Sequence, residues 1–400
     1  MSKKCDLIKF RKTNKFIFFV FLASISYALI DLLSSQSKFF NDENLHPIIF
    51  SISYTFGISL SFILYIIYRI RNKSNKTKIK LVIDEQIPIS FYSTFVKPAT
   101  NKEKFLWIIL TSILDFISCL LNSIFWVNLD NYLNTWAFTI IAMSLFSYWI
   151  LKFKLFKHHY ISMAIIVLIG ILYNIFTDRF ILENMKKNYI FYLVYSLNEI
   201  LISFNYVLYK YLMDIKYIKS YEILFFDGLI ELTLSIITLI ITTNIGNIDN
   251  FWDYYQQLDL KEILIFFSIA IFYFIFTSLV LTVIDIFSPF HVFLLNNLSE
   301  VIIEFYNISN FGMDEYIFSL LSVIIVFIVT LVFVEIIELN FCNISSMTKE
   351  NIKIRARLDT VTTFVDYKEN KSDEVDKIEI NNNNYLIELK NLEDKEFNDN

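Results

Sequence analysis

The stretch from Tyr189 to Leu239 decides the fold. It reads YIFYLVYSLNEILISFNYVLYKYL, then a short basic link, then YEILFFDGLIELTLSIITL. Each of the two apolar runs is long enough to cross a bilayer, for which a helix needs about 20 residues. Yet Glu199 lies inside the first run, and Asp227 and Glu231 lie inside the second. Because an ionisable group at membrane depth is costly, it usually faces a cavity, a partner or a transport path. The stretch therefore predicts a membrane protein with functional acidic residues.

Apolar blocks of similar length recur along the whole chain. Of its 400 residues, 56% are apolar, against about 45–50% in soluble domains. This excess argues against a large soluble helical protein. We expect an all-α membrane protein with ten transmembrane helices, at about residues 15–33, 47–68, 105–127, 133–151, 159–177, 189–212, 221–243, 262–285, 289–308 and 317–339.

Polar segments flank these blocks. Residues 1–14 form a basic N-terminal segment, and residues 341–400 are rich in Asn, Lys, Asp and Glu. Such a composition buries too little apolar surface to offset the entropy of ordering, so we expect the tail to be disordered.

The distribution of Lys and Arg predicts the orientation. With the N-terminus inside, 25 of these residues fall on the cytoplasmic side and five on the other. Many of the 25 lie in the link 69–104. We therefore expect a multi-pass protein with both termini in the cytoplasm, residing in an endomembrane (Golgi, ER or vacuole) or in the plasma membrane.

Ten spans divide into two halves of five, residues 15–177 and 178–340. Because five is odd, the second half enters the membrane from the opposite face. This is the topology of an inverted repeat, in which secondary transporters place the substrate site near the midplane.

Polar residues form stripes at helical spacing on several predicted spans. Four acidic residues of these stripes lie about 15 Å from the starts of their helices, near the middle of the bilayer: Asp115, Glu199, Glu231 and Glu300. No Lys or Arg shares their depth, so these acids are either protonated or line a wet cavity. The Ser, Thr and Asn members can alternatively join helices by hydrogen bonds. The candidate residues of a central substrate or coupling cavity are Asp115, Asn122, Glu199, Ser203, Asp227, Glu231, Asn297 and Glu300.

Nothing in the sequence predicts a metal, a cofactor or an enzyme. The three cysteines Cys5, Cys119 and Cys342 lie far apart and give no disulfide or zinc pattern. His158 and His159 fit the headgroup level of the membrane. No His/Asp, Ser/His or metal-ligand spacing occurs at a common depth, so we expect no catalytic residues.

Two runs resemble a known family. NEILISFNYVLYKYLM (residues 198–213), followed by KYIKSYEILFFDGL (216–229), resembles the F branch of solute carrier family 35, an EamA-like branch of the drug/metabolite transporter superfamily. The runs TWAF (135–138) and KHHY (157–160) are similar to its fourth and fifth spans. The likeness covers residues 15–340, but Ser220 and Tyr221 stand without the proline often seen, and the five glycines are few. It implies ten spans, inverted halves and transport.

Three functions remain open. The acids favour a secondary transporter of a small polar metabolite, cationic or neutral, with proton coupling as an option. The resemblance also allows a nucleotide-sugar transporter of the Golgi or ER, although midplane acids would repel such a doubly negative substrate and only Lys210 stands near a span's end. A non-transporting scaffold or receptor is the third. We expect a small-molecule solute and the bilayer as partners, and no nucleic acid. The sequence is also compatible with a homodimer.

Overall fold

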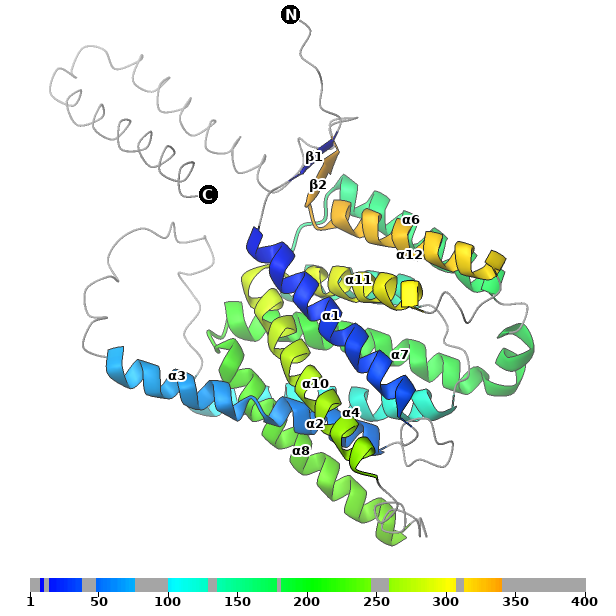
Figure 1. The fold of residues 1–400 in the computed structure, drawn as a ribbon. Coiled ribbons are helices and arrows are strands. Elements are labelled where there is room, and N and C mark those ends of the chain that lie inside the picture. Colours follow the sequence, from blue (N-terminus) through cyan, green and yellow to red (C-terminus); the bar gives the residue numbers. More distant parts are fainter. Residues whose placement is uncertain are drawn as a thin grey trace, which may run out of the picture. The chain divides into compact units, whose positions relative to one another are not determined.

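The computed structural model describes residues 8–10, 14–37, 48–75, 100–128, 135–177, 181–245, 259–306 and 313–339, and the following account concerns these residues. They are helical apart from two three-residue strands (Figure 1). The elements are β1 (Ile8–Phe10), α1 (Asn14–Gln36), α2 (Ile48–Ser59), α3 (Phe62–Asn75), α4 (Asn101–Asn128), α5 (Trp136–Ile150), α6 (Lys157–Thr177), α7 (Ile181–Asp214), α8 (Ser220–Ile245), α10 (Leu260–Ile286), α11 (Phe290–Tyr306), α12 (Met313–Phe333) and β2 (Ile337–Leu339).

Every predicted span coincides with helical structure, with two corrections. The span 47–68 is broken into α2 and α3, and the span 317–339 ends early, because α12 stops at Phe333 and Ile337–Leu339 is a strand. Four helices, α1, α4, α8 and α10, are long and apolar enough to cross a membrane. The chain is therefore a helical membrane protein. The tail 341–400 and most of the link 69–104 lie outside the described residues.

A tight turn and a close approach of backbones mark the break after α2. The amide of Ser61 bonds the carbonyl of Ile58 at 2.9 Å, a tighter turn than the α-helix. A Cβ atom on Gly57 would meet the Ala270 carbonyl oxygen of α10 at 2.4 Å, and one on Gly228 of α8 would meet the Ile58 carbonyl carbon at 2.7 Å. Glycine thus lets α2 lie directly against α8 and α10, as small residues do between membrane helices.

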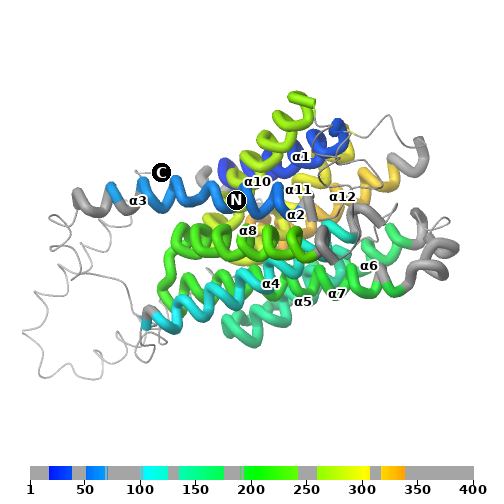
Figure 2. Tube along the Cα trace, turned by 90° about the horizontal axis from the view of Figure 1, so that it is seen from below, coloured from blue at the N-terminus to red at the C-terminus, as the bar shows by residue number. Residues whose placement is uncertain are grey.

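Several pairs of helices pack along each other (Figures 1 and 2). α1 packs on α10 and α11, and α7 packs on α4 and α5. α2 packs on α10, and α8 on α4. α5 packs on α6, and α11 on α12. α2 also packs on α8, α6 on α12, and α5 on α11.

Large apolar side chains fill one end of the bundle, where α7 and α10 end and α8 and α11 begin. Leu212, Ile218, Ile223 and Ile284 are fully buried there and belong to one cluster. The same end carries the antiparallel pair of β1, which precedes α1, and β2, which follows α12. The first and last described segments of the chain therefore meet at this end, which we call the closed end.

Candidate functional site

A cavity of about 390 Å³ lies between the helices. Its wall comes from α1, α2, α4, α5, α7, α10 and α11, and none of its lining residues is Lys or Arg. Polar and aromatic side chains dominate the wall. The lining residues on which the argument depends are Tyr27, Asp31, Tyr54, Asp115, Ser118, Asn122, Trp136, Thr139, Glu199, Tyr206, Tyr273, Asn297 and Glu300.

The cavity is displaced from the closed end. Its wall includes Asp31 and Ser34 near the end of α1, Asn122 in the last two turns of α4, and Thr135 just before α5. These positions belong to the opposite half of the bundle from the cluster of Leu212 and its neighbours. An apolar layer thus closes one end, and a polar cavity occupies the other half.

One helix holds two of the cavity acids. Trp136 donates from Nε1 to Glu300 Oε2 at 2.8 Å, and Thr139 donates from Oγ1 to Glu199 Oε2 at 3.1 Å. Because the two donors lie three residues apart on α5, they share a face. Glu300 is on α11 and Glu199 on α7, so α5 orients carboxylates from two other helices. Ser203 lies behind this pair and does not line the cavity; its fully buried hydroxyl donates to the carbonyl oxygen of Glu199 at 2.9 Å.

Asp115 is held from two sides. The hydroxyl of Tyr54 on α2 lies 3.1 Å from Oδ2, and the amide of Asn205 on α7 lies 3.2 Å from Oδ1. Each oxygen therefore has one donor while the side chain still faces the cavity.

The two candidate asparagines also carry defined bonds. Asn122 accepts a bond of 2.7 Å from the side-chain amide of Asn198, which joins α4 to α7. The amide of Asn297 donates to Thr330 Oγ1 at 3.2 Å, which joins α11 to α12. Both asparagines line the cavity, so these bonds set its polar wall.

Three carboxyl groups gather beside the cavity. One oxygen from each of Asp115, Asp227 and Glu231 lies within 4.8 Å of the others. Asp227 accepts bonds from the hydroxyls of Ser112 and Tyr209. Glu231 is fully buried, and neither of its carboxyl oxygens accepts a hydrogen bond from a described residue.

Such a group cannot carry three negative charges. Carboxylates this close repel one another strongly in a medium of low dielectric constant, and burial of an uncompensated charge is costly. Protons or a bound cation must offset the charge of Asp115, Asp227 and Glu231. We call these three residues the acid cluster. Through Asp115, the acid cluster reaches the cavity wall.

The structure divides the eight candidate residues into two sets. Asp115, Asn122, Glu199, Asn297 and Glu300 line the cavity, whereas Ser203, Asp227 and Glu231 are buried against it. Their roles stay predictions.

The predicted site residues left out the aromatic wall, Tyr27, Tyr54, Trp136, Tyr206 and Tyr273, although Tyr27 and Tyr206 belong to the polar stripes of the first and sixth predicted spans. Because 18% of the residues are aromatic, a tyrosine in a predicted span does not by itself indicate a cavity-lining position. Helical spacing gave one indication that a tyrosine lines the cavity, because Tyr206 lies seven residues after Glu199 and therefore on the same face of the helix.

No protein-family model matches the sequence, and no curated protein is similar to it. The functional argument therefore depends on the cavity and on the residues that line it.

Proposed function

We propose that this protein is a secondary active transporter of a small polar solute, cationic or neutral, coupled to protons and working by alternating access. The observation that carries the proposal is the charge of the cavity wall. Asp115, Glu199 and Glu300 line it, and no Lys or Arg does. A wall of this kind attracts cations and offers carboxyl groups that can take up and release protons.

The proposal includes ten spans in two inverted halves, as in the drug/metabolite transporter superfamily that the sequence resembles. The packing scheme supports it. If α1, α2, α4, α5 and α6 are exchanged for α7, α8, α10, α11 and α12, the pair α1–α10 becomes α7–α4, and α1–α11 becomes α7–α5. Likewise α2–α10 becomes α8–α4. Such a correspondence is expected of two halves related by a pseudo-two-fold axis.

Alternating access needs a site that is closed on one face at a time. The apolar layer at the closed end and the polar cavity in the other half fit one such state. The pairing of β1 with β2 supports an even number of spans, because it brings together the segments that precede α1 and follow α12. By the distribution of Lys and Arg, these segments are cytoplasmic.

A nucleotide sugar fits this cavity poorly. Its diphosphate carries about two negative charges and calls for Arg or Lys in the wall. The wall has carboxyl groups instead, and Lys210, whose Nζ donates to the Asp285 carbonyl oxygen at 2.7 Å, does not line it. A scaffold or receptor would not need acids around a cavity.

Counterflow in proteoliposomes tests the proposal. Vesicles containing the full-length protein are loaded with one unlabelled solute, and uptake of the labelled form is followed. The panel holds organic cations, neutral nucleosides, amino acids and nucleotide sugars, and empty vesicles are the control. We expect saturable counterflow of a cationic or neutral solute. Counterflow restricted to nucleotide sugars would overturn the charge argument.

An access assay separates a carrier from a scaffold without knowledge of the solute. Ser118, which lines the cavity, is replaced by Cys in a protein whose native cysteines are Ser. For a carrier we expect Ser118→Cys to react with impermeant thiol reagents from the side opposite the termini. Leu229→Cys, on the exposed outer face of α8, is the matched control. A Ser118→Cys protein that reacts from neither side, together with no counterflow, would support the scaffold.

A further inference from the structure

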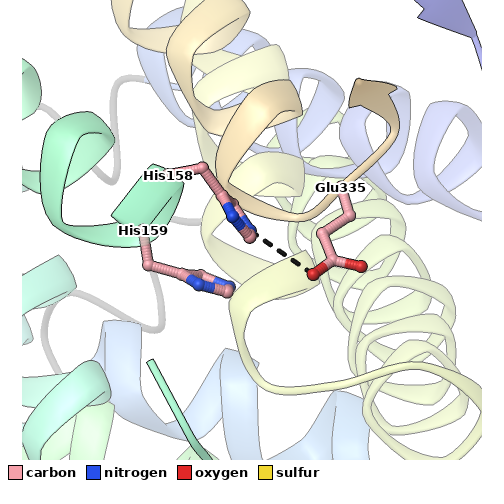
Figure 3. A group of neighbouring side chains, drawn as sticks. All are labelled: His158, His159 and Glu335. Atoms are coloured by element: carbon pink, nitrogen blue, oxygen red, sulfur yellow. Dashed lines mark ion pairs between the residues drawn. The ribbon is translucent and has the colours of Figure 1, made fainter. Parts of the chain in front are cut away.

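Two buried histidines meet a glutamate at the closed end of the bundle. His158 and His159, in the first turn of α6, are 3% and 2% exposed. Glu335 lies in the turn between α12 and β2. One potential ligand atom of each residue lies within 4.8 Å of the other two. Figure 3 shows the three side chains converging from α6 and from the segment after α12.

His158 makes no hydrogen bond with either ring nitrogen to a described residue. Its Nε2 lies at ion-pair distance, 3.3 Å, from Glu335 Oε1 (dashed line in Figure 3), but the two atoms do not have the alignment of a hydrogen bond, and Nδ1 has no hydrogen-bond partner among the described residues. Buried polar atoms are nearly always partnered, so an imidazole buried in this way calls for an explanation. A bound ion on the ring lone pair would supply it.

The spacing of one pair of these atoms fits a metal ion. Zinc binds His nitrogen and carboxylate oxygen at about 2.0–2.2 Å, which places two ligand atoms of a tetrahedral site about 3.3–3.5 Å apart. The distance between His158 Nε2 and Glu335 Oε1 has this value.

His159 has one ring nitrogen left for a ligand role. The backbone amide of Phe156 donates to its Nδ1 at 3.0 Å, which leaves Nε2. Coordination through Nε2 moves the ring proton to Nδ1, and the hydrogen bond from Phe156 is exchanged for the bond to the metal. Metal binding by His159 therefore costs the free energy of one hydrogen bond.

We propose that His158, His159 and Glu335 form a zinc site that ties the start of α6 to the segment following α12. Two imidazoles and one carboxylate are a ligand set that zinc uses, with a fourth position open to water. α6 and α12 pack along each other, so the ion would fasten one end of that pair. None of the three residues lines the cavity, and the site does not depend on the transport function.

The acid cluster is the competing group. It too has three potential ligand atoms within 4.8 Å, but all are carboxylate oxygens. Oxygen-only sites suit harder cations, whereas imidazole suits zinc and other first-row metals. Zinc should therefore prefer the histidine group.

The experiment uses full-length protein with an affinity tag that contains no histidine. The protein is treated with a chelator, loaded with Zn²⁺, desalted and analysed for metal per chain. Co²⁺ serves as a spectroscopic probe, because its visible absorption reports coordination geometry. We expect one equivalent of zinc per chain and a four-coordinate Co²⁺ spectrum that added Zn²⁺ abolishes. Wild-type protein without stoichiometric zinc would overturn the proposal.

Variants locate the ion. His158→Gln and Glu335→Gln should each weaken zinc binding more than about 100-fold, since even outer-shell changes cost about 10–100-fold. His291→Gln is the matched control and should keep its zinc, because this partly buried histidine, although near enough to Glu335 to interact with its charge, is not one of the three proposed ligands and has Nδ1 2.8 Å from Ser288 Oγ. If the His158→Gln protein aggregates, zinc binding by the Glu335→Gln protein tests the site instead. Zinc lost in Glu231→Gln but kept in the other variants would place the ion in the acid cluster instead.

Discussion

Glu231 of α8 lies beside Asp115 of α4, with carboxyl oxygens within 4.8 Å of each other, and it accepts no hydrogen bond from a described residue. Asp115 has two donors, Tyr54 and Asn205. Because Asp115 has hydrogen-bond donors and Glu231 has none, a negatively charged carboxylate is more favourable at Asp115 and a neutral carboxyl group at Glu231. This relationship connects the buried acid cluster to the cavity wall.

Glu231→Gln should preserve thermal stability, because an amide has nearly the shape of a protonated carboxyl group. In the wild type, increasingly alkaline conditions remove protons from the acid cluster and raise the repulsion among Asp115, Asp227 and Glu231. We therefore expect the thermal midpoint of the wild type to fall as pH rises, and that of Glu231→Gln to fall less. Unfolding followed by intrinsic fluorescence in detergent measures both. Ser235→Ala, one turn along α8, should keep the wild-type slope; equal slopes for Glu231→Gln and the wild type would contradict the assignment.

Glu199→Gln should separate coupling from solute binding. The variant keeps an acceptor for Thr139 but cannot titrate. We expect normal insertion, loss of uptake driven by a pH gradient, and surviving solute exchange. Thr139→Val, which removes only the donor, should weaken gradient-driven uptake without abolishing it. Normal pH-dependent uptake by a correctly inserted Glu199→Gln protein would rule out Glu199 as a coupling residue.

Trp136→Phe removes the indole N–H that orients Glu300 and keeps an aromatic ring in place. A net hydrogen bond contributes about 0.5–1.5 kcal/mol. The half-saturation concentration for the transported solute should therefore rise by about 2- to 12-fold. Initial rates of uptake measure this change. Trp107→Phe is the matched control, because Trp107 lies on α4 outside the cavity lining; an equal effect of the two substitutions would argue against a specific role for Trp136.

Gly228→Ala should destabilise the bundle. The added methyl group would lie about 2.7–2.8 Å from the backbone of Ile58 and Ser59, where no flexible side chain can move aside. Overpacking of this kind costs about 1–3 kcal/mol. A lower thermal midpoint and a smaller monodisperse fraction should result. Leu229→Ala, at the next and exposed position, serves as the control and should change both less.

The helices were predictable because their signal is local. Twenty apolar residues bounded by charges mark a membrane helix wherever they occur, and most helix ends lie within a few residues of the predicted ones, except in α3, α7 and α12. The break at Leu60 and Ser61 was not predicted, although Gly57, Ser59 and Ser61 interrupt the apolar sequence there. The packing beside the break, where Gly57 meets α10 and Gly228 of α8 meets Ile58, is a tertiary property that one sequence does not show.

Part of the site was predictable for the same reason. The stripes placed Asp115, Glu199 and Glu300 at one depth, and all three line the cavity. The donors that hold them, Trp136 and Thr139, come from another helix, and one sequence does not say which helices are neighbours. The group of His158, His159 and Glu335 was not predicted for the same reason, since its members come from segments far apart in the sequence.

The paired strands predict a cross-link. Lys9 of β1 faces Glu338 of β2 in the antiparallel register. Lys9→Cys with Glu338→Cys, in a protein without other cysteines, should form an intramolecular disulfide under mild oxidation. A protease site placed in the link 76–99 makes the result visible, because the two fragments stay together only when cross-linked. The single variants are the controls; fragments that separate after oxidation of the double variant would contradict the pairing.

That short ladder has a mechanical consequence. β1 leads into the first helix of one proposed half, and β2 follows the last helix of the other. In the proposed alternating-access cycle, the two strands would form a tether between parts that separate whenever the closed end opens. Opening has to pivot about this tether or rupture its few backbone bonds, so a handful of residues outside the cavity sets the range over which the two halves can swing.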